Sequence, residues 1–245
     1  MFIRAVVFDI DGTLVDHDTA ARQAVLNWSR PWLGGPQADD RVRLWAALEA
    51  EHFARYLTQE IGFAEQRRLR LRGFFAAVGE PIDDELLDEQ FSGYLREYEA
   101  AWTCFEDVHP ALSAVSLRRL AVLSNGEYAQ QVAKLARVGL SGCFEDVLTA
   151  GLLGIAKPAP EVFRICCERL GLLPSEVAYV GDDLRSDAVA ATEAGLVGVW
   201  LNRSGRARPA DTPVQMKVMG SLRELPELLS RIETGVVGGP SSVRL

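Results

Sequence analysis

The sequence predicts an α/β protein: a doubly wound parallel sheet of Rossmann-like type with an inserted α-helical domain. Three observations support this class. Short apolar runs alternate with helix-period segments, one long helical stretch interrupts the alternation, and polar residues directly follow several of the apolar runs. Strands that alternate with helices specify a parallel sheet. Such a sheet binds ligands at the carboxyl ends of its strands, which is where these polar residues lie.

The elements follow one another in order along the chain. The first strand is the apolar run at 4–8, which ends in a turn-rich segment at 9–13. Helix-period stretches then occupy about 18–33, 39–60, 63–79 and 83–100, with no convincing strand between them. Beyond them, strands at 120–124, 144–149, 177–180 and 197–201 alternate with helices at 127–138, 160–170, 184–194 and 222–232. We therefore expect a core formed by 1–16 and 103–234, a helical bundle at 17–102, and a flexible tail at 235–245.

Composition excludes several classes of protein. The net charge of -8 and the pI of about 5.0 argue against a nucleic-acid-binding surface. No apolar run approaches the roughly 20 residues that a bilayer-spanning helix needs, and the N-terminus lacks the pattern of a signal peptide. The four cysteines form no CxxC pair and are expected to be reduced structural thiols. These features predict a cytoplasmic protein that binds neither nucleic acid nor membrane.

Polar residues of complementary chemistry follow four of the predicted strands. Each could by itself be a turn residue or a helix cap. Because the carboxyl ends of parallel strands share one edge of a sheet, we expect the four groups to converge there. The groups, in chain order, are Asp9 with Asp11, Ser124 with Asn125, Lys157, and Asp182 with Asp183 and Asp187.

The segments that contain these residues resemble the haloacid dehalogenase superfamily, in its phosphatase branch with a helical cap inserted after the first motif. The matching segments are FDIDGTL at 8–14, LSNG at 123–126, GIAKPAPEVF at 154–163 and VGDDLRSD at 180–187. A lone DxD motif would be weak evidence for this family, whereas the four segments in this order and spacing are highly specific evidence. The resemblance implies a phosphatase that depends on Mg²⁺.

The resemblance also implies roles for individual residues. Asp9 attacks phosphorus and becomes an aspartyl-phosphate, a known use of a carboxylate nucleophile. Asp11 protonates the leaving alcohol and then deprotonates water. Ser124 and the main-chain N–H of Asn125 bind phosphoryl oxygens, and Lys157 offsets their charge.

A magnesium site is implied at the same place, because Mg²⁺ takes oxygen ligands. The candidate ligands are Asp9, Asp182 and the main-chain carbonyl of Ile10, with the main-chain region of Asp11 as a further possibility. Asp187 is expected in the ligand shell or just behind it. Whether Asp183 contacts the metal stays open at this point.

The rarity of lysine in this chain supports Lys157 as a residue of the site. The chain contains 26 lysines and arginines, of which only Lys134, Lys157 and Lys217 are lysines. A rare residue is unlikely to fall in this motif by chance.

The helical insert offers candidates for substrate contact, although its tryptophans fit a bundle core and its arginines a solvated face. They are Trp28, Trp32, Trp45, Arg41, Arg43, Arg67, Arg68, Arg70 and Arg72.

The leading hypothesis is therefore a phosphomonoesterase that acts on a small phosphorylated metabolite. A phosphomutase is the alternative, because it also needs Asp9 and Asp11. A 2-haloacid dehalogenase is disfavoured by the presence of Asp11, and a catalytically silent regulatory protein by the complete set of catalytic residues. The sequence does not decide between a monomer and a homodimer.

Overall fold

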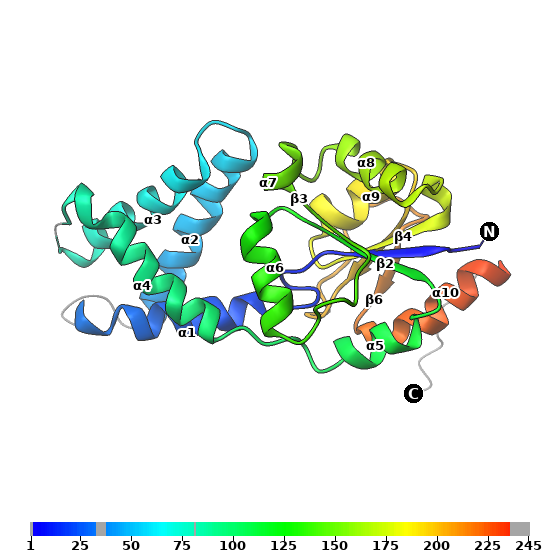
Figure 1. The fold of residues 1–245 in the computed structure, drawn as a ribbon, viewed down its shortest axis with the longest axis horizontal. Coiled ribbons are helices and arrows are strands. Elements are labelled where there is room, and N and C mark those ends of the chain that lie inside the picture. The colour runs from blue at the N-terminus through cyan, green and yellow to red at the C-terminus, as the bar shows by residue number, and fades with distance from the viewer. Residues whose placement is uncertain (1, 33–37, 81, 236–245) are drawn as a thin grey trace. The chain divides into compact units, whose positions relative to one another are not determined.

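The protein divides into two compact units, which Figure 1 shows in a computed structural model that describes residues 2–32, 38–80 and 82–235. The core unit comprises Met1–Val15 and Cys104–Leu245, and the helical unit comprises Asp16–Thr103. Each boundary lies one residue away from the position expected at 16/17 and 102/103. The predicted flexible tail lies outside the described residues, apart from Gly235.

The core unit is built on a six-stranded parallel sheet with strand order β3-β2-β1-β4-β5-β6. β1 lies at the centre, paired with β2 on one side and β4 on the other. Five of the strands match predicted segments, and β6 was missed because three residues show no periodicity. The strands are β1 (Ala5–Phe8), β2 (Arg119–Ser124), β3 (Asp146–Thr149), β4 (Val177–Gly181), β5 (Val197–Leu201) and β6 (Lys217–Met219).

Helices cover both faces of this sheet, so the central strands are buried throughout. Side chains alternate between the faces along β1: Val6 and Phe8 pack with α5, α6 and α10, while Ala5 and Val7 pack with α8 and α9. This is the doubly wound fold that the sequence predicts. The helices are α5 (Val108–Ala114), α6 (Tyr128–Arg137), α7 (Ala150–Leu153), α8 (Pro160–Leu170), α9 (Ala190–Glu193) and α10 (Leu225–Thr234), with short 3₁₀ turns at η3 (Pro174–Glu176) and η5 (Leu222–Glu224).

The segment after β4 differs from its prediction. A single helix was expected at 184–194, but the chain forms a π-helix, η4 (Leu184–Val189), before it continues as α9. Single π-helical turns are often found at functional sites. Here the turn carries Asp187, which is 1% exposed.

The helical unit contains no strand among its described residues, in agreement with the sequence. Its helices are α1 (His17–Trp28), α2 (Ala38–Leu57), α3 (Phe63–Val78) and α4 (Leu87–Ala100), with 3₁₀ turns at η1 (Arg30–Trp32) and η2 (Asp84–Leu86). Its core is aromatic: Trp45 lies 4.4 Å from Tyr94 and 5.4 Å from Trp28 between ring centroids.

The candidate substrate-contact residues of the helical unit are engaged within that unit. Trp28 and Trp45 belong to its core, and the side chain of Trp32 lies outside the described part. Arg41 and Arg70 are buried rather than solvated. The six arginines and their partners are Arg41 with Ser29, Arg43 with Asp40, Arg67 with the rings of Phe63 and Phe91, Arg68 with Asp88, Arg70 with Glu49 and the ring of Trp45, and Arg72 with Glu65 and Asp84.

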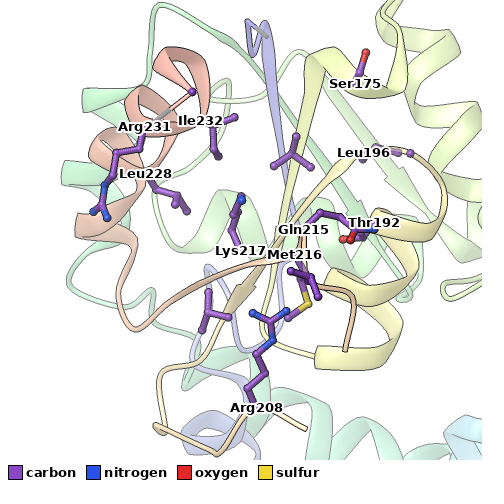
Figure 2. Close-up of a pocket in the computed structure, with 15 residues that line it drawn as sticks. Ser175, Thr192, Leu196, Arg208, Gln215, Met216, Lys217, Leu228, Arg231 and Ile232 are labelled. Atoms are coloured by element: carbon purple, nitrogen blue, oxygen red, sulfur yellow. The ribbon is translucent and has the colours of Figure 1, made fainter. Parts of the chain in front are cut away.

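A cavity of about 640 Å³ lies in the core unit beside β5, β6 and α10 (Figure 2). Its lining includes Ser175, which precedes β4, and the first residues of β5 and β6, Val197 and Lys217. It therefore lies toward the amino ends of these strands, opposite the end where the polar motif residues lie. None of the described helices combines the length and apolar composition that crossing a bilayer needs.

Candidate active site

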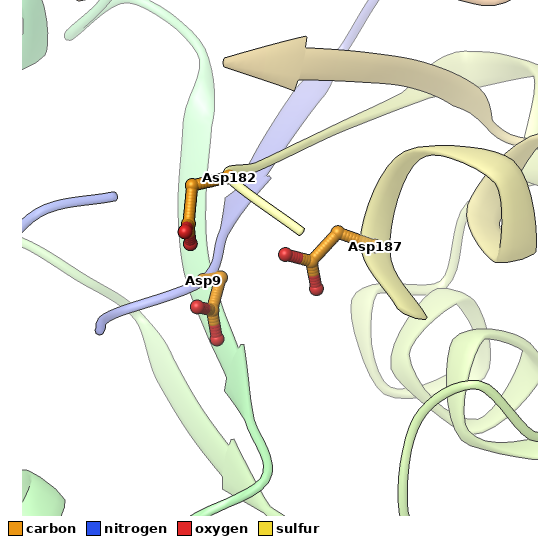
Figure 3. A group of neighbouring side chains, drawn as sticks. All are labelled: Asp9, Asp182 and Asp187. Atoms are coloured by element: carbon orange, nitrogen blue, oxygen red, sulfur yellow. The ribbon is translucent and has the colours of Figure 1, made fainter. Parts of the chain in front are cut away.

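Three aspartates converge at the carboxyl ends of the two central strands (Figure 3). Asp9 directly follows β1, and its N–H donates to the carbonyl of Val180 at 2.9 Å. Asp182 directly follows β4, the neighbour of β1, and Asp187 reaches the same point from η4. One carboxylate oxygen from each lies within 4.8 Å of the others. The sheet register therefore brings together side chains that are up to 178 positions apart in the sequence, as the difference between 9 and 187 shows.

Lys157 is a cation that contacts two of these three aspartates. Its Nζ lies 2.7 Å from Oδ1 of Asp9 and 2.7 Å from Oδ1 of Asp187, and it donates to the Tyr179 hydroxyl at 2.9 Å. The side chain is 3% exposed. One ammonium among three carboxylates leaves an excess of negative charge in a buried place, which a divalent cation can offset.

Burial and crowding of the carboxylates affect their protonation. Burial raises the pKa of Asp9 well above its ordinary value; Lys157 opposes the rise, and Asp187 and Asp182 add to it. Burial, followed by repulsion from Asp187, raises the pKa of Asp182 to about 7. Lys157 shows the matching effect: burial alone would lower its pKa, but Asp187 and Asp9 raise it above its ordinary value. The lysine is therefore charged, and the carboxylates compete for one positive partner.

Gly12 makes room for this arrangement. Its φ is +78°, a conformation that favours glycine, and a Cβ there would lie 2.4–2.6 Å from the carboxylate atoms of Asp182. The turn after β1 can therefore pass directly beside the Asp182 carboxylate only because this position is a glycine.

The side chain of Asn125 holds the Ser124–Asn125 segment next to the main chain of Lys157. The Asn125 side chain donates to the carbonyl of Lys157 at 2.9 Å and accepts from its N–H at 2.8 Å. The side chain of Asn125 thus ties two loops together. Ser124 does not cap the following helix: α6 begins at Tyr128, and its N-cap residue is Glu127.

Two of the residues considered as metal ligands, Ile10 and Asp183, have hydrogen-bond partners within the protein. The carbonyl of Ile10 accepts the N–H groups of Thr13, Leu14 and Val15 at 3.3, 2.9 and 2.9 Å, so it is directed into the turn. This geometry argues against Ile10 as a metal ligand. Asp183 accepts the N–H groups of Arg185 and Ser186 as the N-cap of η4, which explains its presence without a metal.

Asp11 lies beside two residues that sequence reasoning missed. Its Oδ1 is 2.5 Å from Nζ of Lys134, and its Oδ2 accepts from Nε2 of Gln131 at 2.9 Å. Lys134 is 2% exposed. The rarity of lysine, which supported Lys157, applies equally to Lys134 and could have identified it.

The arrangement has a definite chemical capacity. Three clustered carboxylates are hard oxygen donors of the kind that Mg²⁺ prefers, and their excess charge matches a divalent ion. Asp9 can act as a nucleophile beside that ion, and Asp11 can exchange a proton two residues away.

The comparisons with known proteins agree with this reading. A family model described as haloacid dehalogenase-like hydrolase matches residues 3–195. The N-acylneuraminate-9-phosphatase of Mus musculus is 27% identical over 255 residues, which covers 96% of each chain. The glyceraldehyde 3-phosphate phosphatase of Methanopyrus kandleri is 30% identical over 207 residues, which covers 82% of this chain and 84% of the relative.

Solved structures include a hydrolase and a dehalogenase. YfnB of Bacillus subtilis, a HAD-hydrolase crystallised with bound magnesium, matches with a TM-score of 0.79 at 21% identity, over 94% of this chain and 99% of that one. This likeness concerns the fold. The 2-haloacid dehalogenase of Pseudomonas syringae matches with a TM-score of 0.68 at 29% identity, over 94% of this chain and 100% of that one.

Proposed function

Because this chain belongs to the haloacid dehalogenase-like hydrolase family, we propose that it is a Mg²⁺-dependent phosphomonoesterase acting on a small phosphorylated metabolite. One observation carries the proposal: Asp9, Asp182 and Asp187 form one cluster, Lys157 contacts Asp9 and Asp187, and Asp11 lies two residues after Asp9. The curated phosphatase relatives support the choice of reaction.

In the first step, Asp9 attacks the phosphorus atom of the ester. The bond between phosphorus and the ester oxygen breaks, and Asp11, which enters this step as the protonated acid, transfers its proton to the departing oxygen, which leaves as the alcohol. The hydroxyl of Ser124 and the main-chain N–H of Asn125 hold phosphoryl oxygens, while the ammonium of Lys157 offsets their charge. The product of this step is an aspartyl-phosphate on Asp9.

In the second step, Asp11 takes a proton from water as the water attacks the phosphorus of the aspartyl-phosphate. The bond from phosphorus to the Asp9 oxygen breaks, which releases inorganic phosphate and restores the carboxylate. Asp9, Asp182 and the main-chain region of Asp11 would hold Mg²⁺, with Asp187 beside them. When bound, the ion supplies positive charge that reduces repulsion between the carboxylate and the phosphate.

Two relatives suggest the class of substrate. N-acylneuraminate-9-phosphatase and glyceraldehyde 3-phosphate phosphatase are both named for phosphorylated carbohydrates. We therefore place sugar phosphates first in a substrate panel, followed by nucleotide monophosphates and phosphorylated acids. We also propose a cytoplasmic location, and that the helical unit acts as a cap domain.

Haloacid dehalogenases are also among the similar structures, so their reaction is the second candidate. A dehalogenase has no alcohol to protonate, and the pairing of Asp11 with Lys134 would then serve no reaction step. Halide release from a 2-haloacid in the presence of a chelator would favour this reading.

The test is phosphate release from the panel, with Mg²⁺ and with a chelator, by the wild type and by Asp9→Asn. We expect release that depends on Mg²⁺ and is lost in the variant. Asp39→Asn is the matched control, because Asp39 is an exposed aspartate of the helical unit paired with Arg22. Release that survives in Asp9→Asn would overturn the proposal, and conversion of a hexose 1-phosphate into the 6-phosphate with little free phosphate would identify a mutase.

A further inference from the structure

We propose that Lys134 and Gln131, on one face of α6, are positioning residues that hold the Asp11 carboxylate and the Ser124 hydroxyl in place for phosphoryl transfer. The inference deepens the proposed function and rests on it. The two residues are three positions apart on a helix, which places their side chains next to each other. No motif of the sequence includes either of them.

Lys134 holds one oxygen of the Asp11 carboxylate. Its Nζ lies 2.5 Å from Oδ1, and the lysine side chain is 2% exposed whereas that of Asp11 is 31% exposed. The carboxylate is therefore fixed from its buried side and accessible from the other. A buried ammonium is costly unless it is paired, and apolar residues would fill the same space without that cost. Retaining a charge here fits a role in placing Asp11.

Gln131 holds the other oxygen and also contacts the phosphate site. Its Nε2 donates to Oδ2 of Asp11 at 2.9 Å and to Oγ of Ser124 at 3.0 Å. Both amide hydrogens are thereby used. The opposite amide orientation would turn Oε1 toward a carboxylate, which repels it. The contacts thus determine the orientation of the glutamine amide.

This orientation determines the direction of the Ser124 hydroxyl. Its oxygen accepts from Gln131 and, at 3.4 Å, from the N–H of Gly126. Among the described residues it donates to no acceptor, so its hydrogen is available to a phosphoryl oxygen. Gln131 therefore links the phosphate-binding hydroxyl with the acid–base carboxylate, at a fixed separation.

Gly126 makes the close approach of Gln131 possible. A Cβ at this position would lie 2.3 Å from Nε2 and 2.9 Å from Cδ of the glutamine. The glycine of the LSNG segment, which the sequence alone does not explain, thus accommodates the amide of Gln131.

The test compares two leaving groups. 4-Nitrophenolate leaves without protonation, whereas the alkoxide of a sugar phosphate needs the proton of Asp11. The value of kcat/KM reports steps up to release of the alcohol. A misplaced Asp11 therefore lowers kcat/KM for an alkyl phosphate while it affects 4-nitrophenyl phosphate little. A general loss of structure lowers both equally.

We expect Lys134→Met to lower kcat/KM about 100-fold for the best alkyl phosphate of the panel, with a much smaller loss for 4-nitrophenyl phosphate. Gln131→Met is the second variant, and it also raises KM for both substrates because the Ser124 hydroxyl loses its fixed direction. Lys217→Met is the matched control. Lys217 lies on β6 at the cavity shown in Figure 2, and has no ion pair with the described residues.

The outcomes separate the two proposals. Equal losses on both substrates, in a Lys134→Met variant that melts at the wild-type temperature, would refute the positioning role. If Lys134→Met does not fold, the same comparison on Gln131→Met decides. A wild type that hydrolyses neither substrate would overturn the proposed function, and the positioning role with it.

Discussion

The two units of the protein use charged residues in different ways. In the helical unit, arginines pair with acids or rings of the same unit, as Arg68 does with Asp88 and Arg70 with Trp45. In the core unit, the two buried lysines instead join strand ends and loops that are distant in sequence. Pairs of the first kind stabilise a local surface or core. The pairs of the two buried lysines concentrate charged groups from distant parts of the sequence at one buried place, which is typical of a catalytic site.

The strongest test of this difference is the loss of the nucleophile. Asp9→Asn preserves the size of the side chain but removes its charge, so we expect kcat to fall by about 10⁴-fold or more. Asp39→Asn in the helical unit is expected to leave kcat unchanged. Phosphate release under saturating Mg²⁺ measures both. A similar kcat for the two variants would contradict the claim that the charged residues of the core unit, and not those of the helical unit, carry out the reaction.

The second test concerns stability. Lys157→Met leaves Asp9 and Asp187 buried without their common cation, and we expect the free energy of unfolding to fall by about 3–5 kcal/mol in the absence of metal. Urea denaturation in a chelator measures it. The comparison variant is Arg68→Met, whose pair with Asp88 is exposed and for which we expect no measurable change. An equal loss of unfolding free energy in both variants would mean that the ion pairs of Lys157 contribute no more to stability than an exposed ion pair.

The third test uses pH. The pKa of Asp182 is about 7 in the folded chain, above the ordinary value of 3.8 that applies when the chain unfolds. The folded chain therefore binds the proton more tightly, so Asp182 favours the folded state at low pH and loses this contribution as the pH rises from about 4 through 7.

Magnesium requires the ionised carboxylate, so it competes with this proton. We expect the rise in melting temperature on adding Mg²⁺ to be larger at pH 8 than at pH 6, and to be much reduced in Asp182→Asn. Thermal unfolding at both pH values, with and without chelator, measures it. A stabilisation by Mg²⁺ that is the same at both pH values would contradict the assignment of Asp182 as a ligand.

The smallest expected effect is in the helical unit. Arg72→Met breaks exposed pairs with Glu65 and Asp84, and should change neither the melting temperature nor kcat/KM measurably. A large loss of kcat/KM with an unchanged melting temperature would show instead that Arg72 contacts the substrate.

Sequence reasoning predicted the fold well because the periodicity of short buried strands is a local property. It also grouped Asp9, Ser124, Lys157 and Asp182, because the ends of parallel strands share an edge. It missed Lys134 and Gln131, since their relation to Asp11 depends on how α6 packs against the sheet. The direction of the Ile10 carbonyl depends on turn hydrogen bonds that no periodicity reveals.

The most direct test of the proposed mechanism is to trap the phosphorylated enzyme. Asp11→Asn should accept the phosphoryl group from 4-nitrophenyl phosphate, whose leaving group needs no acid, but should lack the base for hydrolysis. After rapid acid quenching, peptide mass spectrometry is expected to find phosphate on Asp9, and none when Asp9→Asn is added. Phosphate release by the wild type, with no phosphorylated Asp9 in the Asp11→Asn variant at any time, would contradict the mechanism.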